Sequence, residues 1–439
     1  DAVGDAAGAD AAGADQRLGD AQRLVAALGW YWTVRGRLGE ARRSLDRVLA
    51  FGDEGSIASS PAAASAVVWR AVVASVQGDP AAAEHRRAAF DAVPSIDDPV
   101  AAARATALLA YTSLDAGDVD GAEAVADDAR RRSAAVGDRW GEAVALVALS
   151  FLAHARGDAD RLADASARAG ELFGQVGDGW GRVVAATWQA AAAELTGDLE
   201  AAARILEESR GDAEHLGLWS EVASGLAWSG WIAVERDDPE RAEVLATQAM
   251  RLAAEQGVRS TQIQAAMVQA FAARRVGDLD RAEVRLRELI AGAEADGGDA
   301  AAIYLTTVLS ELGQLAVLRG DAVGALDLHA RALELALAGG YPRDAAYAMQ
   351  GGAAAAGLQG RWEDAARLLG AVARQLDETR LPPSPAEQQD IERITVRCVE
   401  ALGRAAFDRR RDEGRRMAAA EARRLLESGS GVRQVHMPT

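Results

Sequence analysis

The amino-acid sequence predicts an all-α fold, a solenoid of about nine helix–turn–helix units that ends in a helical cap. The first observation is a Gly-Asp step, or a close variant of it, that returns at intervals of 39 to 43 residues. The second is a small residue at a fixed distance on each side of the step. The third is a composition rich in Ala and Leu, with only 10 Pro in 439 residues. Such a period is typical of stacked repeats, in which each unit packs on its neighbours.

The recurring step marks the turn inside each unit. Its Gly accepts the left-handed conformation that ends a first helix, and its Asp can cap a second helix. We therefore expect helix A, a tight turn and helix B, placed in the seventh unit near Thr261–Val276 and Asp280–Glu294. The nine steps begin at Gly36, Gly78, Gly117, Gly157, Gly197, Asp237, Gly277, Gly320 and Gly360.

Small residues flank each turn, which predicts that the two helices of a unit cross closely. Seven residues before the step, all nine positions are small: Gly29, Ala71, Ala110, Ser150, Ala190, Gly230, Ala270, Gly313 and Ala353. Five residues after the first residue of the step, eight of nine are Ala: Ala41, Ala83, Ala122, Leu162, Ala202, Ala242, Ala282, Ala325 and Ala365.

The repeat array is expected over residues 16–375, and other segments frame it. Proline ends the last repeat helix, and a capping helix pair is expected beyond it because a solenoid must cover its terminal apolar face. These segments are a low-complexity linker at 1–15, longer loops at Gly52–Ala64 and Val93–Val100, a Pro-rich linker at 376–386, capping helices at 387–428 and a frayed tail at 429–439.

Charge and composition exclude several classes of function. The net charge is −18 and all 48 basic residues are Arg, so nucleic acid and anionic membranes are poor partners. The single Cys398 excludes a disulfide framework, and no apolar run reaches the roughly 18 residues of a membrane span. We expect a cytoplasmic protein. Because the chain begins with Asp1, we also expect it to be a piece of a longer one.

Catalytic motifs are not found in the sequence. His85, His154, His215, His329 and His436 lack metal-ligand spacing, and a phosphate-binding loop needs a Lys that the sequence does not contain. The expectation is no catalytic residue, no metal and no cofactor. An enzyme on a helical-repeat frame is the least favoured alternative.

The repeat resembles the tetratricopeptide repeat. The resemblance is clearest in Leu309–Asp321, followed by Ala325 and Leu333, although these units are about six residues longer than the standard 34. It implies a right-handed solenoid whose concave groove is lined by helix A.

Helix A carries an aromatic stripe one residue after the small position, and further candidates follow one turn along the same face. We expect these side chains to bind an extended peptide or an amphipathic small molecule. The alternative is that the aromatic rings fill gaps between neighbouring A helices. The candidate ligand-binding residues are Trp30, Tyr111, Phe151, His154, Glu194, Trp231, Phe271 and Arg274.

Two further groups receive structural interpretations. Repeated tryptophans are predicted to pack between units; they are Trp69, Trp188 and Trp228 in one register and Trp140, Trp180 and Trp219 in another. The basic concentration near the C-terminus is predicted to form ion-paired helices rather than a DNA contact; it consists of Arg404, Arg409, Arg410, Arg411, Arg415, Arg416, Arg423 and Arg424.

The ending resembles the C-terminal end of the helical-repeat region in large actinobacterial transcriptional regulators. The motif runs from Gly360–Gly370 through Leu402-Gly403 and Ala406-Phe407 to Gly414-Arg415. The resemblance implies a non-enzymatic arm that senses an inducer, a peptide or a protein and acts on ATPase and DNA-binding domains of the same longer polypeptide. The alternative is a free-standing scaffold for protein–protein interaction. Self-association is an open alternative to a monomer.

Overall fold

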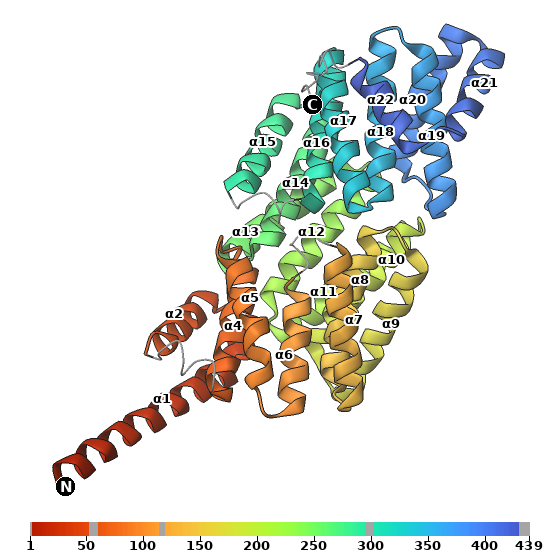
Figure 1. Cartoon of the computed structure of the whole chain (residues 1–439). Coiled ribbons are helices and arrows are strands. Elements are labelled where there is room, and N and C mark those ends of the chain that lie inside the picture. The colour runs from red at the N-terminus through yellow and green to blue at the C-terminus, as the bar shows by residue number, and fades with distance from the viewer. Residues whose placement is uncertain (1, 52–59, 114–118, 296–301, 430–439) are drawn as a thin grey trace, which may run out of the picture.

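The structure is a computed structural model that describes residues 2–51, 60–113, 119–295 and 302–429. The described residues form 21 α-helices and one short 3-10 helix, with no strand among them (Figure 1). The expected all-α repeat solenoid is confirmed. No helix within these ranges is both long enough and apolar enough to cross a membrane.

Nine helix pairs form the repeat units, and the A helix of each pair precedes its B helix. The pairs are α1 (Ala2–Val34) with α2 (Leu38–Leu49), α4 (Pro61–Gln77) with α5 (Ala82–Ala92), α6 (Pro99–Tyr111) with α7 (Val119–Ala135), α8 (Arg139–Ala155) with α9 (Ala159–Val176), α10 (Gly179–Leu195) with α11 (Leu199–Leu216), α12 (Trp219–Glu235) with α13 (Pro239–Gln256), α14 (Arg259–Arg275) with α15 (Leu279–Ala295), α16 (Ala302–Leu318) with α17 (Ala322–Gly339), and α18 (Pro342–Leu358) with α19 (Trp362–Thr379). The seventh unit thus lies within two residues of its expected bounds.

The turn inside each unit has the expected geometry. Eight of the nine step residues have a positive φ, including the non-glycine Asp237 at 59°, while Gly117 lies outside the described residues. The Asp side chains accept backbone N–H groups at the start of helix B, as the sequence predicts. The clearest caps, each bonded three residues ahead, are Asp158, Asp198, Asp238, Asp278 and Asp321.

A second set of glycine turns joins five of the units to the units that follow them, and the sequence analysis did not single it out. Its glycines also have a positive φ and end the B helices: Gly137, Gly177, Gly217, Gly257 and Gly340. Four of them repeat every 40 residues, so the same search for a period would have found them.

The small positions pack closely, with one shift of register. Ala41, Ala202 and Ala325 have no exposed surface. In the second unit, however, Ala83 is exposed and Ala82 is buried. The turn differs locally: Asp79 accepts the N–H of Ala81, two residues ahead, and α5 begins at Ala82, four residues after Gly78 rather than the two residues seen in the other units.

The segments that frame the array differ in part from expectation. Helix α1 begins at Ala2, within the predicted linker, because Ala is a strong helix former. The loop predicted at Gly52–Ala64 lies mostly outside the described residues, and α4 begins at Pro61 within it. The segment Val93–Val100 contains the 3-10 helix η1 (Val93–Ser95) and the start of α6. The proposed domain boundaries stay predictions.

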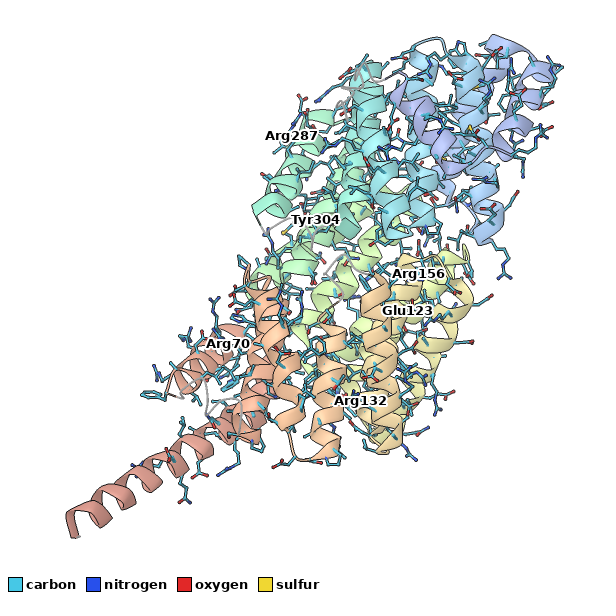
Figure 2. The ribbon with its side chains drawn as sticks, in the orientation of Figure 1. Arg70, Glu123, Arg132, Arg156, Arg287 and Tyr304 are labelled. Carbon is cyan, nitrogen blue, oxygen red and sulfur yellow. The ribbon has the colours of Figure 1, made fainter. Side chains whose placement is uncertain are left out.

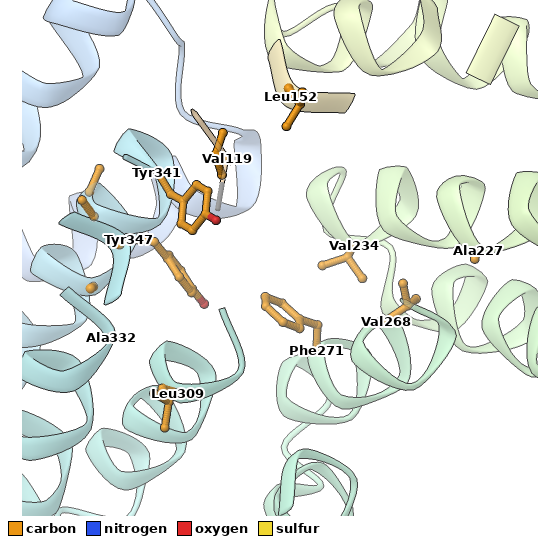
Figure 3. Packing of buried hydrophobic residues seen from close by; sticks show 14 of the residues in the cluster. Val119, Leu152, Ala227, Val234, Val268, Phe271, Leu309, Ala332, Tyr341 and Tyr347 are labelled. Carbon is orange, nitrogen blue, oxygen red and sulfur yellow. The ribbon is translucent and has the colours of Figure 1, made fainter. Parts of the chain in front are cut away.

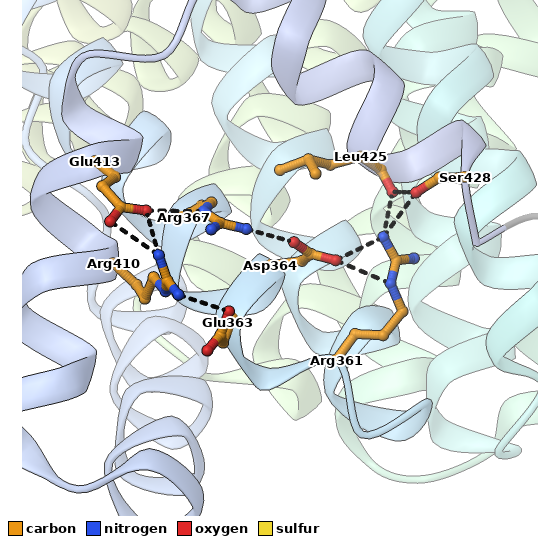
Figure 4. A network of polar contacts seen from close by, with 8 residues as sticks. All are labelled: Arg361, Glu363, Asp364, Arg367, Arg410, Glu413, Leu425 and Ser428. Carbon is orange, nitrogen blue, oxygen red and sulfur yellow. Dashed lines mark hydrogen bonds and ion pairs between the residues drawn. The ribbon is translucent and has the colours of Figure 1, made fainter.

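The cap consists of three helices rather than a pair: α20 (Pro385–Leu402), α21 (Arg404–Arg415) and α22 (Ala419–Glu427). Helices α19 and α21 cross so closely that a Cβ on Gly414 would meet the carbonyl oxygen of Arg367. Around this crossing, Arg367 and Arg410 both donate to Glu413, and Arg361 donates to the carbonyl of Leu425 at 2.9 Å (Figure 4). This network agrees with the predicted ion-paired role of the C-terminal arginines.

Ion pairs between neighbouring units add to the apolar packing. Arg156 at the end of α8 lies 3.1 Å from Glu123 of α7, and both are labelled in Figure 2. Such partly exposed pairs contribute little individually. The buried Ala and Leu side chains therefore provide most of the stability.

The array is coiled so that units far apart in the sequence are in contact. Arg35 of the first unit donates to the carbonyl of Leu216, 181 residues away. From the other end, Leu381 is buried in a cluster with Leu162 and Leu195, so the Pro-rich segment packs against the fourth and fifth units. The coil closes around a central cavity.

Candidate ligand-binding cavity

A cavity of about 690 Å³ lies inside the coil, and residues of all nine A helices line it, together with residues of α2 and α5 and the start of α20. The lining of the groove by helix A is the arrangement that the resemblance to the tetratricopeptide repeat implies. A second hollow of about 840 Å³ shares Trp30 with this cavity and is lined by Trp69 and Trp140.

Seven of the eight candidate residues line the central cavity: Trp30, Tyr111, Phe151, His154, Trp231, Phe271 and Arg274. Glu194 does not; its side chain is fully buried, and it interacts with His154 at 3.4 Å. The rings also touch one another, since Trp231 and Phe271 have centroids 5.2 Å apart. These residues therefore both pack between units and line the cavity. Their role in binding stays a prediction.

One part of the cavity wall is almost wholly aromatic. Trp30 of α1 meets Trp180 of α10 edge to face, with ring centroids 4.6 Å apart, although the two residues are 150 positions apart. Tyr111 packs on Trp180 in the same manner at 6.2 Å. Apolar rings with polar edges form surfaces that accept apolar and cationic groups.

Sequence reasoning missed three cavity tryptophans, Trp180, Trp188 and Trp228, which it assigned only to packing. Trp188 and Trp228 do pack between units, with centroids 5.9 Å apart. Their register, nine residues before the step, was the signal. Trp219 departs from the packing prediction because its side chain is 46% exposed.

Trp180 also forms a hydrogen bond with the carboxyl group of Glu221, a second residue of the cavity wall. Its indole N–H donates to Glu221 Oε1 at 2.7 Å, while Glu221 Oε2 is buried and has no hydrogen-bond partner among the described residues. Burial raises the pKa of Glu221 to about 7, and the hydrogen bonds from Trp180 and from the backbone of Glu221 offset only part of this effect.

Another part of the wall is a buried charge cluster around Arg343. This side chain donates to Glu194 and Glu235 and lies 3.7 Å from Glu387 of α20. Burial raises the pKa of Glu194, but the charge of Arg343 and the His154 hydrogen bond reverse this and bring the pKa below its ordinary value. Burial and then the Glu194 charge raise the pKa of Glu235 well above its ordinary value. Arg343 thus joins two carboxyl groups whose pKa values are shifted in opposite directions.

A second buried network links α14, α16 and α18. Arg274 donates to Glu311, and the Tyr347 hydroxyl donates to the other oxygen of Glu311 at 2.7 Å. Phe271 and Tyr347 face each other with ring planes inclined by 21° (Figure 3). The next residue, Arg275, donates to Asp390 of the cap at 3.1 Å. These contacts fix the arginines in place.

The side chains that line the cavity are of the kinds that bind a ligand. Within the described ranges, no group of three or more His, Cys, Asp or Glu side chains is placed to hold a metal ion. The cavity instead combines aromatic faces, paired arginines and one carboxyl group without a charged partner. Such a mixture holds and orients a ligand by shape, stacking and charge.

No protein-family model and no curated protein sequence matches the chain. Among solved structures, the chain is similar to a crystal structure of a Rap protein complexed with Competence and Sporulation Factor, with a TM-score of 0.61, 11% sequence identity, and coverage of 82% of this chain and 99% of the other. Aspartyl phosphate phosphatase F from Bacillus subtilis matches with a TM-score of 0.40 and 14% identity, over 96% of this chain and 97% of that one. The first match supports the helical-repeat fold; the second TM-score is too low to indicate a shared arrangement.

Proposed function

We propose that this protein is a non-enzymatic receptor that binds a peptide, a protein segment or a small inducer in its central cavity. The observation that carries the proposal is the cavity itself, to which all nine A helices contribute residues. Support comes from the similar Rap structure, which was solved with a bound factor. Pre-formed aromatic cavities of this size are typical ligand sites.

The experiment compares ligand capture by Trp231→Ala with capture by Trp219→Ala. Trp231 lines the cavity, whereas Trp219 is 46% exposed and lies outside the lining, so both variants lose one indole but only one changes the site. Each purified protein is incubated with a cell extract, and bound peptides, metabolites and proteins are identified by mass spectrometry. We expect Trp231→Ala to lose the ligand that the wild type and Trp219→Ala retain. Equal capture by all three proteins would reject the cavity as the binding site.

We further propose that the receptor is the sensing arm of a cytoplasmic transcriptional regulator, in which ligand binding acts on ATPase and DNA-binding domains of the same polypeptide. The resemblance of residues 387–428 to the end of such arms supports this proposal. Sequencing the complete gene tests it. Absence of ATPase and DNA-binding domains from the reading frame would favour the free-standing scaffold instead.

A further inference from the structure

Glu221 differs from Glu235 and Glu387, the other Glu residues that line the cavity, because these two lie beside Arg343 and Glu221 has no such cation within the ranges that the structure describes. Its carboxyl group receives hydrogen bonds from the Trp180 indole and from the backbone of Glu221 itself, while Oε2 has no hydrogen-bond partner among the described residues. Among the described residues, no charged side chain contributes to the shift of the Glu221 pKa. A buried, half-satisfied carboxyl group is costly to the folded protein, since a missing hydrogen bond to a buried acceptor costs about 1–3 kcal/mol.

Three of the five arginines that line the cavity are paired with acids, and a fourth, Arg86, donates to the Ser75 hydroxyl and the Thr112 carbonyl. Arg274, Arg275 and Arg343 line the cavity, and each has an acidic partner; these partners are Glu311 for Arg274, Asp390 for Arg275, and Glu194 with Glu235 for Arg343. These three arginines are thus paired with acids, while no cation pairs with Glu221 among the described residues. The contents of the cavity can supply a partner for Glu221.

The surroundings of Glu221 define what that partner is like. Trp180 is in contact with Trp30 and Tyr111, so aromatic rings lie beside the carboxyl group. Aromatic faces attract cations, and the attraction is stronger where water is displaced. The net charge of −18 also draws cations toward the protein.

Resting on the proposed receptor function, we propose that the cavity ligand carries a protonated amine or a guanidinium group that pairs with Glu221, flanked by apolar surface that stacks on Trp180 and Trp30. The terminal torsion of a Glu side chain is broad, so rotation of the carboxyl group brings Oε2 to the ligand at little cost. The cationic group belongs either to a peptide or to a small organic amine, and the two sources are separated below.

The test uses the purified full chain and a hexapeptide library. One position carries Arg or its neutral isostere citrulline in equal amounts, and the other positions carry apolar and aromatic residues. A second arm compares 2-phenylethylamine with 2-phenylethanol. Retained compounds are separated from free ones by gel filtration and quantified by mass spectrometry. The variants are Glu221→Gln and, as the control, Glu171→Gln, which removes a carboxylate that is 63% exposed.

We expect the wild type and Glu171→Gln to retain Arg peptides about tenfold over citrulline peptides, which corresponds to about 1.4 kcal/mol, and Glu221→Gln to lose this preference. Retention of the amine but of no peptide assigns the cation to a small molecule. If peptides are retained without any preference for Arg in the wild type, this inference is overturned while the receptor function stands. If the wild type retains no probe, the result counts against both the cationic ligand and the receptor function. The preference of the wild type for Arg peptides over citrulline peptides tests the proposed cationic ligand even if Glu221→Gln does not fold.

Discussion

At the scale of single residues, His329 shows how an unpaired polar group limits stability. Its ring has no exposed surface, and neither ring nitrogen has a hydrogen-bond partner among the described residues. The ring fits because Gly313 and Gly351, on the A helices before and after it, have no side chains; a Cβ on either would lie within 2.5 Å of the ring. The glycines are therefore required by the imidazole between them.

His329 should make the protein sensitive to mild acid. Burial lowers its pKa from 6.5 to about 3, so between these values the unfolded chain binds a proton that the folded chain does not. Stability is therefore complete above the unfolded pKa and falls as the pH drops below it. Between pH 7 and 5 we expect a loss of about 2 kcal/mol from this residue. The measurement is urea unfolding at both pH values for the wild type and His329→Leu, whose loss should be smaller by that amount.

His215→Leu is the matched control for this measurement because His215 is exposed. It should leave the pH dependence of the wild type unchanged. An unaltered pH dependence in His329→Leu would show that the buried imidazole does not carry the effect.

At the scale of elements, the turn inside each unit depends on a left-handed residue. Gly277 has a φ of 84° and no neighbouring atom within 4 Å of an added Cβ, so only the backbone conformation restricts this position. Asp237 fills the equivalent position with a φ of 59°, in keeping with the tolerance of Asp and Asn for this region. The helices before and after the turn pack independently of the side chain at this position.

Gly277→Ala should lower the free energy of unfolding by about 1–2 kcal/mol, because an L-residue with a side chain is strained in the left-handed region. Gly277→Asn should cost less. The control is Gly174→Ala on the exposed face of α9, which also has an open environment but no positive φ. That change should stabilise by about 0.5–1 kcal/mol. Chemical denaturation of the three variants measures these differences, and equal effects at both glycines would contradict the backbone explanation.

At the scale of the whole molecule, contacts between distant units set the shape of the coil. Arg343 at the start of α18 pairs with Glu194 of α10, which is 149 residues away, and with Glu235 of α12. It also lies near Glu387 at the start of α20. One side chain therefore connects the fifth, sixth and ninth units with the cap. Its ion pairs therefore link these units around the cavity.

Arg343→Met should destabilise the protein by about 3 kcal/mol, because it leaves the buried Glu194 carboxylate without its cation. The effect should spread: amide hydrogen exchange should increase in α10, α12 and α20 together. Arg251→Met removes an exposed pair whose side chains are 67% and 51% exposed, and it should change stability by less than about 1 kcal/mol. Exchange that increases only around α18 would contradict the proposed long-range connection.

The sequence by itself determined the unit, because its signals are local. A left-handed glycine and a capping Asp act within a few residues, so nine turns, their helices and the inward register of Trp30, Phe151 and Trp231 could be predicted. The sequence also indicated the cap, although not its third helix. Only the tertiary structure decided the closure of the coil, which brings Trp30 to Trp180 and Arg343 to Glu194. The physical reason is that the curvature of a solenoid is the sum of small rotations between units, and no motif in one unit encodes that sum.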